Sequence, residues 1–239
     1  MQFKLVNVAA FAIMVYMNYL ANTMPLGGKT TGELSAQYPN LFVPAGITFS
    51  IWGIIYLLLL VFCVIQFMAH NRAMVNALGW LFAISCILNA LWIVAWHHEK
   101  LYISVILMLL LLATLIIINY RLVTFSESIS KAAFGVYLGW ICIATIANIT
   151  ALLVAINWQG WGISDEAWAV IMVLTGTFIT LLVLSNYRNP FTGIAVIWAL
   201  TGIMIARWPG NQPILIAAAA SILTIAVISV IVTVRDQPA

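Results

Sequence analysis

The charged residues of this 239-residue chain all lie between long apolar runs or close to the ends of those runs. Only 6% of the residues are charged and 65% are apolar, whereas a typical soluble domain has about 25% charged residues. An unpaired ion in hydrocarbon costs several kcal/mol, so the pattern predicts a chain embedded in a lipid bilayer. The net charge of +3 is small and scattered, which argues against nucleic-acid binding.

The lengths of the apolar runs predict an all-α, polytopic transmembrane bundle of about eight spans, because one span needs about 20 mostly apolar residues. The seventh run is the shortest and is bounded by Arg188 and Arg207. It is either a short span or a re-entrant segment, and therefore seven spans are the alternative. The eight runs are 3–22, 46–69, 78–97, 101–121, 132–156, 168–187, 191–207 and 213–234.

The distribution of Lys and Arg predicts the orientation of the chain. Cytoplasmic loops carry an excess of these residues. With eight spans, the N-terminal side holds Lys4, Arg72, Arg121, Lys131, Arg188 and Arg235, and the opposite side holds Lys29, Lys100 and Arg207. We therefore expect a multi-pass protein of the cell membrane with both termini in the cytoplasm and the loop 23–45 outside.

The ten tryptophans divide into two groups by their depth in the runs. Trp80, Trp96, Trp158, Trp161, Trp168 and Trp208 lie near run ends, as expected for an interfacial aromatic belt. Trp52, Trp92, Trp140 and Trp198 lie deeper. Three of these four share a helix face with polar or aromatic residues, at spacings of three, four or seven. The three faces are Phe49, Trp52 and Tyr56; Asn89, Trp92 and Trp96; and Tyr137, Trp140, Ala144 and Asn148.

Two asparagines inside these runs, Asn89 and Asn148, need hydrogen-bond partners because an unsatisfied amide in hydrocarbon is costly. Each either joins two helices or contacts a ligand beside its tryptophan. Gly135 and Gly139 form a GxxxG step, and small residues at this spacing favour close helix packing. This step serves packing within the chain or a homodimer seam.

Sequence evidence for metal binding or for acid–base catalysis is weak. The three cysteines are far apart in the sequence, and the three histidines lie near run ends, with no inward-facing acid–base set. We therefore expect no metal site, and an enzyme is the less favoured class. A secondary transporter is an alternative, suggested by the number of spans and by a possibly broken seventh run.

Several motifs together resemble the TspO/translocator protein family of tryptophan-rich sensory proteins. They are Met24-Pro25-Leu-Gly-Gly28, then Pro44 followed by Phe49-Ser-Ile-Trp52 and Tyr56, then Leu88-Asn89-Ala-Leu-Trp92, and finally Tyr137-Leu-Gly-Trp140 with Ala144 and Asn148. The resemblance covers residues 1–157. We accordingly expect a TspO-like five-helix unit over 1–157 and a three-helix extension over 158–239.

The resemblance implies a sensor or receptor that binds a hydrophobic ligand, a tetrapyrrole (porphyrin or haem) or a sterol-like molecule, inside the bilayer. It implies a pocket lined by Trp52, Tyr56, Asn89, Trp92, Tyr137, Trp140, Ala144 and Asn148, and capped by a loop containing Pro25, Gly28 and Pro44. Trp52 and Trp140 match the positions of the two family tryptophans linked to light-dependent porphyrin breakdown. Such a degrading activity is a further alternative.

Overall fold

The computed structural model describes residues 2–23 and 28–235, and this part of the chain consists of helices and short connections. The long helices are α1 (Gln2–Thr23), α3 (Ile51–Ile65), α5 (Leu81–His97), α6 (Leu101–Leu122), α7 (Ser128–Ala155), α8 (Asp165–Tyr187), α9 (Pro190–Arg207) and α10 (Gln212–Arg235). Two short helices, α2 (Thr31–Ala36) and α4 (Arg72–Leu78), lie in connections, and a 3₁₀ turn, η2 (Gly46–Ser50), leads into α3.

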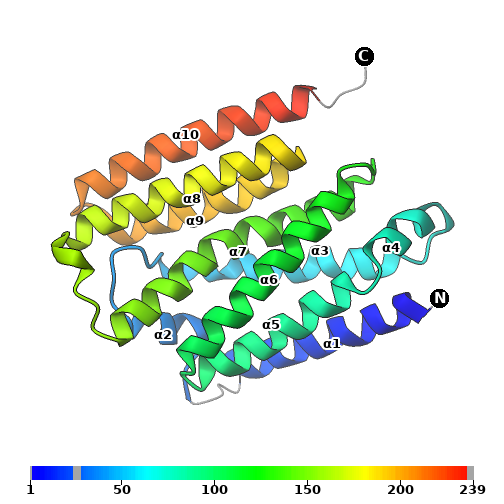
Figure 1. Ribbon diagram of the computed structural model, residues 1–239, viewed down its shortest axis with the longest axis horizontal. Coiled ribbons are helices and arrows are strands. Elements are labelled where there is room, and N and C mark those ends of the chain that lie inside the picture. Colours follow the sequence, from blue (N-terminus) through cyan, green and yellow to red (C-terminus); the bar gives the residue numbers. More distant parts are fainter. Residues whose placement is uncertain (1, 24–27, 236–239) are drawn as a thin grey trace.

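Consecutive long helices run in opposite directions along one bundle, so the start of α1 and the end of α10 lie at the same end, on the right in Figure 1. Within the described residues, seven helical segments are long and apolar enough to cross a membrane, and there are eight if the bent pair of α4 and α5 forms one span. An even number of crossings is the count that puts the two termini on one side. The expected polytopic helical bundle is confirmed.

Most of the expected spans match the helices to within a few residues, and the differences have local causes. The second run was expected to reach residue 69, but α3 ends at Ile65. The next side chain, Gln66, is buried, with its amide bonded to Asn7 and to the Lys4 carbonyl oxygen. The third run was expected to begin at 78, but Gly79 has a φ of 55° and separates α4 from α5 at a bend of 59°. The seventh run is one unbroken helix, α9, and not a broken or re-entrant segment.

Helix boundaries follow from capping residues in the sequence. The Asn189 side chain accepts a hydrogen bond from the Phe191 N–H, and Pro190 occupies the first turn of α9, where its missing N–H costs nothing. The short helix α2 begins with a capping box in which Thr30 and Glu33 bond reciprocally. This box fixes the start of α2, which contacts α5 and η2.

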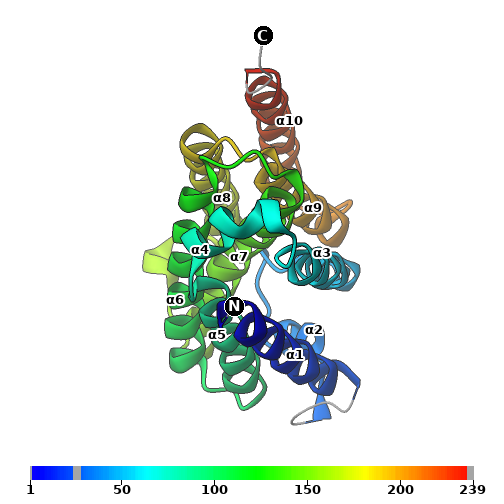
Figure 2. The same cartoon turned by 90° about the vertical axis from the view of Figure 1, so that its right-hand side faces the viewer.

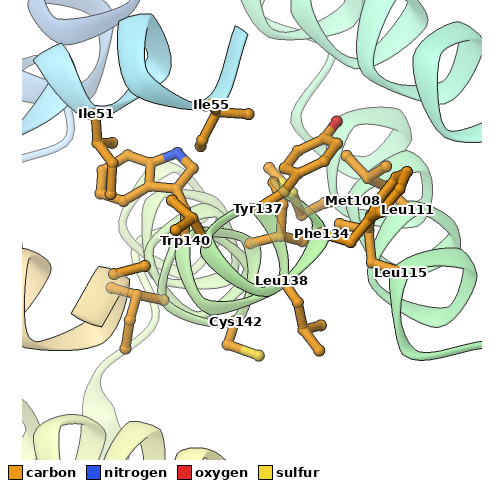
Figure 3. Close-up of a cluster of buried hydrophobic side chains, with 14 of the residues drawn as sticks. Ile51, Ile55, Met108, Leu111, Leu115, Phe134, Tyr137, Leu138, Trp140 and Cys142 are labelled. Carbon is orange, nitrogen blue, oxygen red and sulfur yellow. The ribbon is translucent and has the colours of Figure 1, made fainter. Parts of the chain in front are cut away.

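Helix α7 is the centre of the bundle, because it contacts α3, α6, α8 and α9 (Figure 2). Its two faces serve different neighbours (Figure 3): Trp140 points toward Ile51 and Ile55 of α3, whereas Phe134 packs among residues of α6. The GxxxG step lies against α9 of the same chain. A Cβ on Gly139 would stand 2.3 Å from the Thr192 carbonyl oxygen, and one on Gly135 would meet the Asn189 side chain. These glycines therefore serve packing within the chain, and a homodimer through other faces stays a prediction.

Candidate functional site

Trp52 is the hub of an aromatic cluster between α3, α5 and α7. Its ring centroid lies 6.1 Å from that of Trp92, 6.1 Å from that of Trp140 and 6.0 Å from that of Tyr137. Tyr56, one turn further along α3, stacks on it at 5.6 Å. The offset and edge-to-face arrangements are those that aromatic pairs prefer. The three helix faces predicted from residue spacing thus meet at one place.

Asn89 belongs to a chain of hydrogen bonds that joins three helices. The Asn18 side chain of α1 donates to Asn89 Oδ1 at 2.8 Å, and Asn89 Nδ2 donates to the Tyr137 hydroxyl oxygen at 3.0 Å. Asn89 is fully buried. Both ends of its amide are used, so Asn89 joins helices, which is one of the two roles that its sequence position left open.

Asn148 joins helices through only one end of its amide. Its Oδ1 accepts from the Trp92 indole N–H of α5 at 2.9 Å and from the Ser104 hydroxyl of α6 at 2.8 Å. These two donors fix which end of the amide faces them. The amide nitrogen, Nδ2, is buried and has no partner among the described residues. Asn148 therefore joins three helices through its oxygen and presents an unused N–H₂ group on its other side.

Asn148 is one of the residues that line a small cavity of about 50 Å³ beside the aromatic cluster. The indole Nε1 of Trp140, which also lines the cavity, is buried without an acceptor, and so is the Thr31 hydroxyl. None of the lining side chains is charged. They are Thr31, Ser35, Pro44, Phe49, Trp52, Trp92, Trp96, Trp140, Ile143, Ala144, Ala147 and Asn148.

The cavity has aromatic walls, and two of its lining residues carry buried hydrogen-bond donors without a partner among the described residues. Asn148 Nδ2 and Trp140 Nε1 can only donate, and the one amide oxygen of the cavity wall already accepts two bonds. A ligand that pairs with these donors would therefore need hydrogen-bond acceptors, such as carbonyl oxygens, on a largely apolar body.

The structure brings five of the eight predicted pocket residues to the cavity wall: Trp52, Trp92, Trp140, Ala144 and Asn148. The other three lie behind it. Tyr56 and Tyr137 support the Trp52 ring, and Asn89 bonds Tyr137. Of the predicted cap, Pro44 lines the cavity, whereas Gly28 is exposed and has open space around its Cα. Pro25 lies outside the described residues.

Sequence reasoning assigned Trp96 to the interfacial belt, and this assignment is wrong. Trp96 is 5% exposed, stacks on Trp92 at 6.2 Å, and donates from its indole N–H to the Thr31 carbonyl oxygen at 3.4 Å. It ties α2 to α5 over the cavity. The spacing of Trp96 from Asn89 and Trp92 places it on their helix face and could have predicted its burial, whereas its position near a run end suggested the membrane interface. Thr31 and Ser35 were missed because their segment has no apolar run that would predict a cavity wall.

We compared the chain with families and with individual proteins. A family model described as TSPO-like protein matches residues 4–232. The chain belongs to this TSPO-like family. The match runs on through α8, α9 and most of α10, beyond residues 1–157, where the sequence motifs resemble the family. No significant match was found among curated proteins or among solved structures. The division of the chain into a five-helix unit and an extension stays a prediction.

In this TSPO-like chain, α9 contacts the segment that leads into α3. The Trp198 indole N–H donates to the Thr48 carbonyl oxygen at 2.9 Å, and the Ala45 amide N–H donates to the Gly202 carbonyl oxygen at 3.0 Å. Arg207 reaches the Val43 carbonyl oxygen at 3.4 Å. Trp198, the fourth deep tryptophan, therefore lies outside the cavity and bonds the backbone of the cavity's wall segment.

A second cavity of about 430 Å³ lies on another face of α7, between α7, α8 and residues 39–41. It is larger than the cavity at Trp140 and holds Trp158 and Trp168 at one end. Its wall residues on α7, Ile146, Thr150 and Leu153, are about 120° around the helix from those of the first cavity. None of the predicted pocket residues lines it, so we place the candidate site at the smaller, aromatic cavity.

The histidines and cysteines form no site in the described part of the chain. No group of three or more His, Cys, Asp or Glu residues there could hold a metal ion. His97 is buried, and its Nδ1 lies 2.9 Å from the Ile93 carbonyl oxygen of its own helix, whereas His98 is exposed. The two neighbours point in different directions, as adjacent residues of a helix do.

Proposed function

We propose that this TSPO-like membrane protein is a sensor or receptor that binds a hydrophobic, acceptor-bearing ligand at the Trp52–Trp140–Asn148 cavity. A tetrapyrrole or a sterol-like molecule is the ligand class that the family resemblance suggests. The observation that carries the proposal is the pair of buried, uncommitted donors, Trp140 Nε1 and Asn148 Nδ2, beside four indole faces. Buried donors without partners are costly, so their presence favours a bound acceptor.

The size of the cavity determines how such a ligand would bind. Ligand pockets commonly have volumes of about 300–1,000 Å³, whereas this cavity has about 50 Å³. A tetrapyrrole therefore requires one wall to move. Helix α3 packs on α7, and α5 packs on α1 and α6, whereas the residues from Phe42 to Ser50 form an irregular stretch and a 3₁₀ turn. This stretch and α2 are the parts of the wall that can give way.

The proposal is tested by titrating the detergent-solubilised protein with protoporphyrin and following tryptophan fluorescence quenching. Trp140→Phe keeps most of the ring but removes the indole donor, so Kd should rise roughly 2- to 12-fold, the equivalent of one neutral hydrogen bond. Trp52→Ala combined with Trp140→Ala should weaken binding further. Trp208→Phe is the matched control, because Trp208 is 73% exposed and lies outside the cavity lining. Equal affinities of the wild type and the Trp52→Ala, Trp140→Ala variant would refute the site.

Light-dependent porphyrin breakdown is a second candidate, because the rings of Trp52 and Trp140 contact each other at the cavity wall. Illumination of the protein with protoporphyrin should then bleach the Soret band faster with wild type than with Trp140→Phe. Equal bleaching rates at saturating protein would eliminate this activity. A transporter was favoured by a possibly broken seventh run, but α9 is continuous. Only the number of spans still favours transport.

We further propose that both termini lie in the cytoplasm. The end of the bundle that holds the termini also carries the larger share of Lys and Arg, including Lys4, Arg72, Arg121 and Lys131. Green fluorescent protein fused to either terminus should fluoresce, and alkaline phosphatase at the same positions should be inactive. The reverse pattern at either end would contradict the orientation.

A further inference from the structure

One wall of the aromatic cavity is held by a helix that does not line the cavity. The wall residues Pro44 and Phe49 belong to the segment Val43–Phe49, hereafter the wall segment. Helix α9 contacts this segment along its length: Arg207 at Val43, Gly202 at Ala45 and Trp198 at Thr48. The last contact joins residues 150 positions apart in the sequence.

The contact between α9 and the wall segment is close as well as hydrogen-bonded. Gly202 is buried, and a Cβ there would stand 1.9 Å from the Thr48 hydroxyl oxygen and 2.7 Å from its methyl carbon. No side chain other than hydrogen fits at 202 without moving the wall segment. Residues 43–45 of the segment lie outside any helix, and the Thr48 amide of η2 bonds the Ala45 carbonyl oxygen.

We propose that α9 is a latch that keeps the wall segment over the cavity, with Trp198 and Gly202 as its positioning residues. The proposal rests on the ligand site proposed above, because that site is too small until a wall moves. Release of the Trp198–Thr48 and Ala45–Gly202 hydrogen bonds would let Pro44 and Phe49 swing away from Trp52 and Trp140. The helices after residue 157 would then regulate access to the cavity without touching its ligand.

The first arm of the test uses no ligand. Hydrogen–deuterium exchange is measured by mass spectrometry on peptides that cover residues 43–50 in the full-length protein. Trp198→Phe removes the donor to Thr48 and should speed exchange of the Ala45 and Thr48 amides roughly 2- to 12-fold. Gly202→Ala, which forces the segment off α9, should act in the same direction. The controls are Trp208→Phe, on an exposed indole beyond the same helix, and Gly53→Ala, which has open space for a Cβ.

The second arm measures the rates of protoporphyrin quenching by stopped flow. A latch limits both entry and exit, so Trp198→Phe should raise the association and the dissociation rate constants together, with a smaller change in Kd. A merely destabilised site would lose affinity through faster dissociation alone. The controls should keep the wild-type rates.

The two arms separate the latch from the proposed function. Unchanged exchange over residues 43–50 in both Trp198→Phe and Gly202→Ala overturns the latch, whatever the binding result. Faster exchange with unchanged association in a chain that binds protoporphyrin also overturns it. If wild-type protein quenches no protoporphyrin fluorescence and binds none, the tetrapyrrole assignment fails, and the exchange arm alone decides whether α9 holds the segment.

Discussion

Replacement of Asn148 by alanine tests the junction of α5, α6 and α7. The side chain is 3% exposed, and among the described residues its Oδ1 is the acceptor for both the Trp92 indole and the Ser104 hydroxyl. Both donors are buried. Asn148→Ala therefore breaks two interhelical bonds in one step and leaves the Trp92 N–H without an acceptor, whereas Ser104→Ala breaks one and leaves the Trp92–Asn148 bond intact.

The expected magnitudes follow from this difference. Interhelical hydrogen bonds in membrane proteins contribute on average about 0.6 kcal/mol each, with a maximum near 1.7. Ser104→Ala should then lower the free energy of unfolding by about 0.6 kcal/mol, and Asn148→Ala by roughly 1–3 kcal/mol. In the Ser104→Ala background, Asn148→Ala should cost about 0.6 kcal/mol less than in wild type, because the shared bond is already gone.

The assay is reversible unfolding in mixed micelles of increasing SDS fraction, followed by circular dichroism so that tryptophan changes do not distort the signal. Asn186→Ala is the control, because Asn186 is exposed and its side chain bonds the Leu182 carbonyl oxygen of its own helix. This variant should stay within about 0.5 kcal/mol of wild type. A cost for Asn148→Ala no larger than that of Ser104→Ala, or a zero coupling between the two, would refute the three-helix junction.

Three further predictions use the same preparations. Tyr137→Phe leaves the buried Asn89 Nδ2 without its acceptor and should cost about 1–3 kcal/mol, whereas Tyr102→Phe, at an exposed tyrosine, should be neutral in the same unfolding assay. Gly139→Ala should destabilise the fold by about 1–3 kcal/mol because a Cβ meets the α9 backbone, whereas Gly53→Ala should not; equal stabilities would contradict the α7–α9 packing. Burial, then the hydrogen bond to Glu99, raises the pKa of Tyr38 from 10.0 to about 12. The folded state favours the neutral phenol. The resulting contribution of Tyr38 to the free energy of unfolding is therefore fully present below pH 10 and is lost as the pH rises through about 12. The difference in absorbance at 295 nm between wild type and Tyr38→Phe should accordingly titrate near pH 12, and a step near pH 10 would count against the contact with Glu99.

The membrane-spanning helices could be predicted from the sequence because one physical term dominates them. Hydrocarbon excludes charge, so residues such as Arg121 and Arg188 mark where apolar runs stop. The two boundaries that were wrong depend on terms that hydropathy does not contain. Gln66 is polar but buried by bonds to α1, and Gly79 breaks a helix through its backbone conformation rather than its polarity.

The cavity was predictable where residues share a helix face and not where chain segments meet. Spacing along α3, α5 and α7 placed Trp52, Trp92 and Trp140 together, because faces that carry aromatic and amide groups avoid lipid. The same reasoning could not distinguish the role of Asn89 from that of Asn148, since each role depends on which neighbouring helices supply the hydrogen-bond partners. Thr31 and Ser35 enter the wall through the fold of a polar connection, and Trp198 contacts it across 150 residues. No helical spacing in the sequence relates Thr31, Ser35 or Trp198 to the cavity.

The contact between Trp198 and Thr48 has a consequence for the order in which the protein is made. Chains grow at about 5–20 residues per second, so the 150 residues between the two positions take roughly 8–30 s to synthesise. In the last part of this interval, after α7 ends at Ala155, the first five long helices are complete, with the stretch before α3 still lacking its support. Nascent protein should therefore pass through a stage with an open aromatic cavity, which closes only when the seventh long helix is inserted.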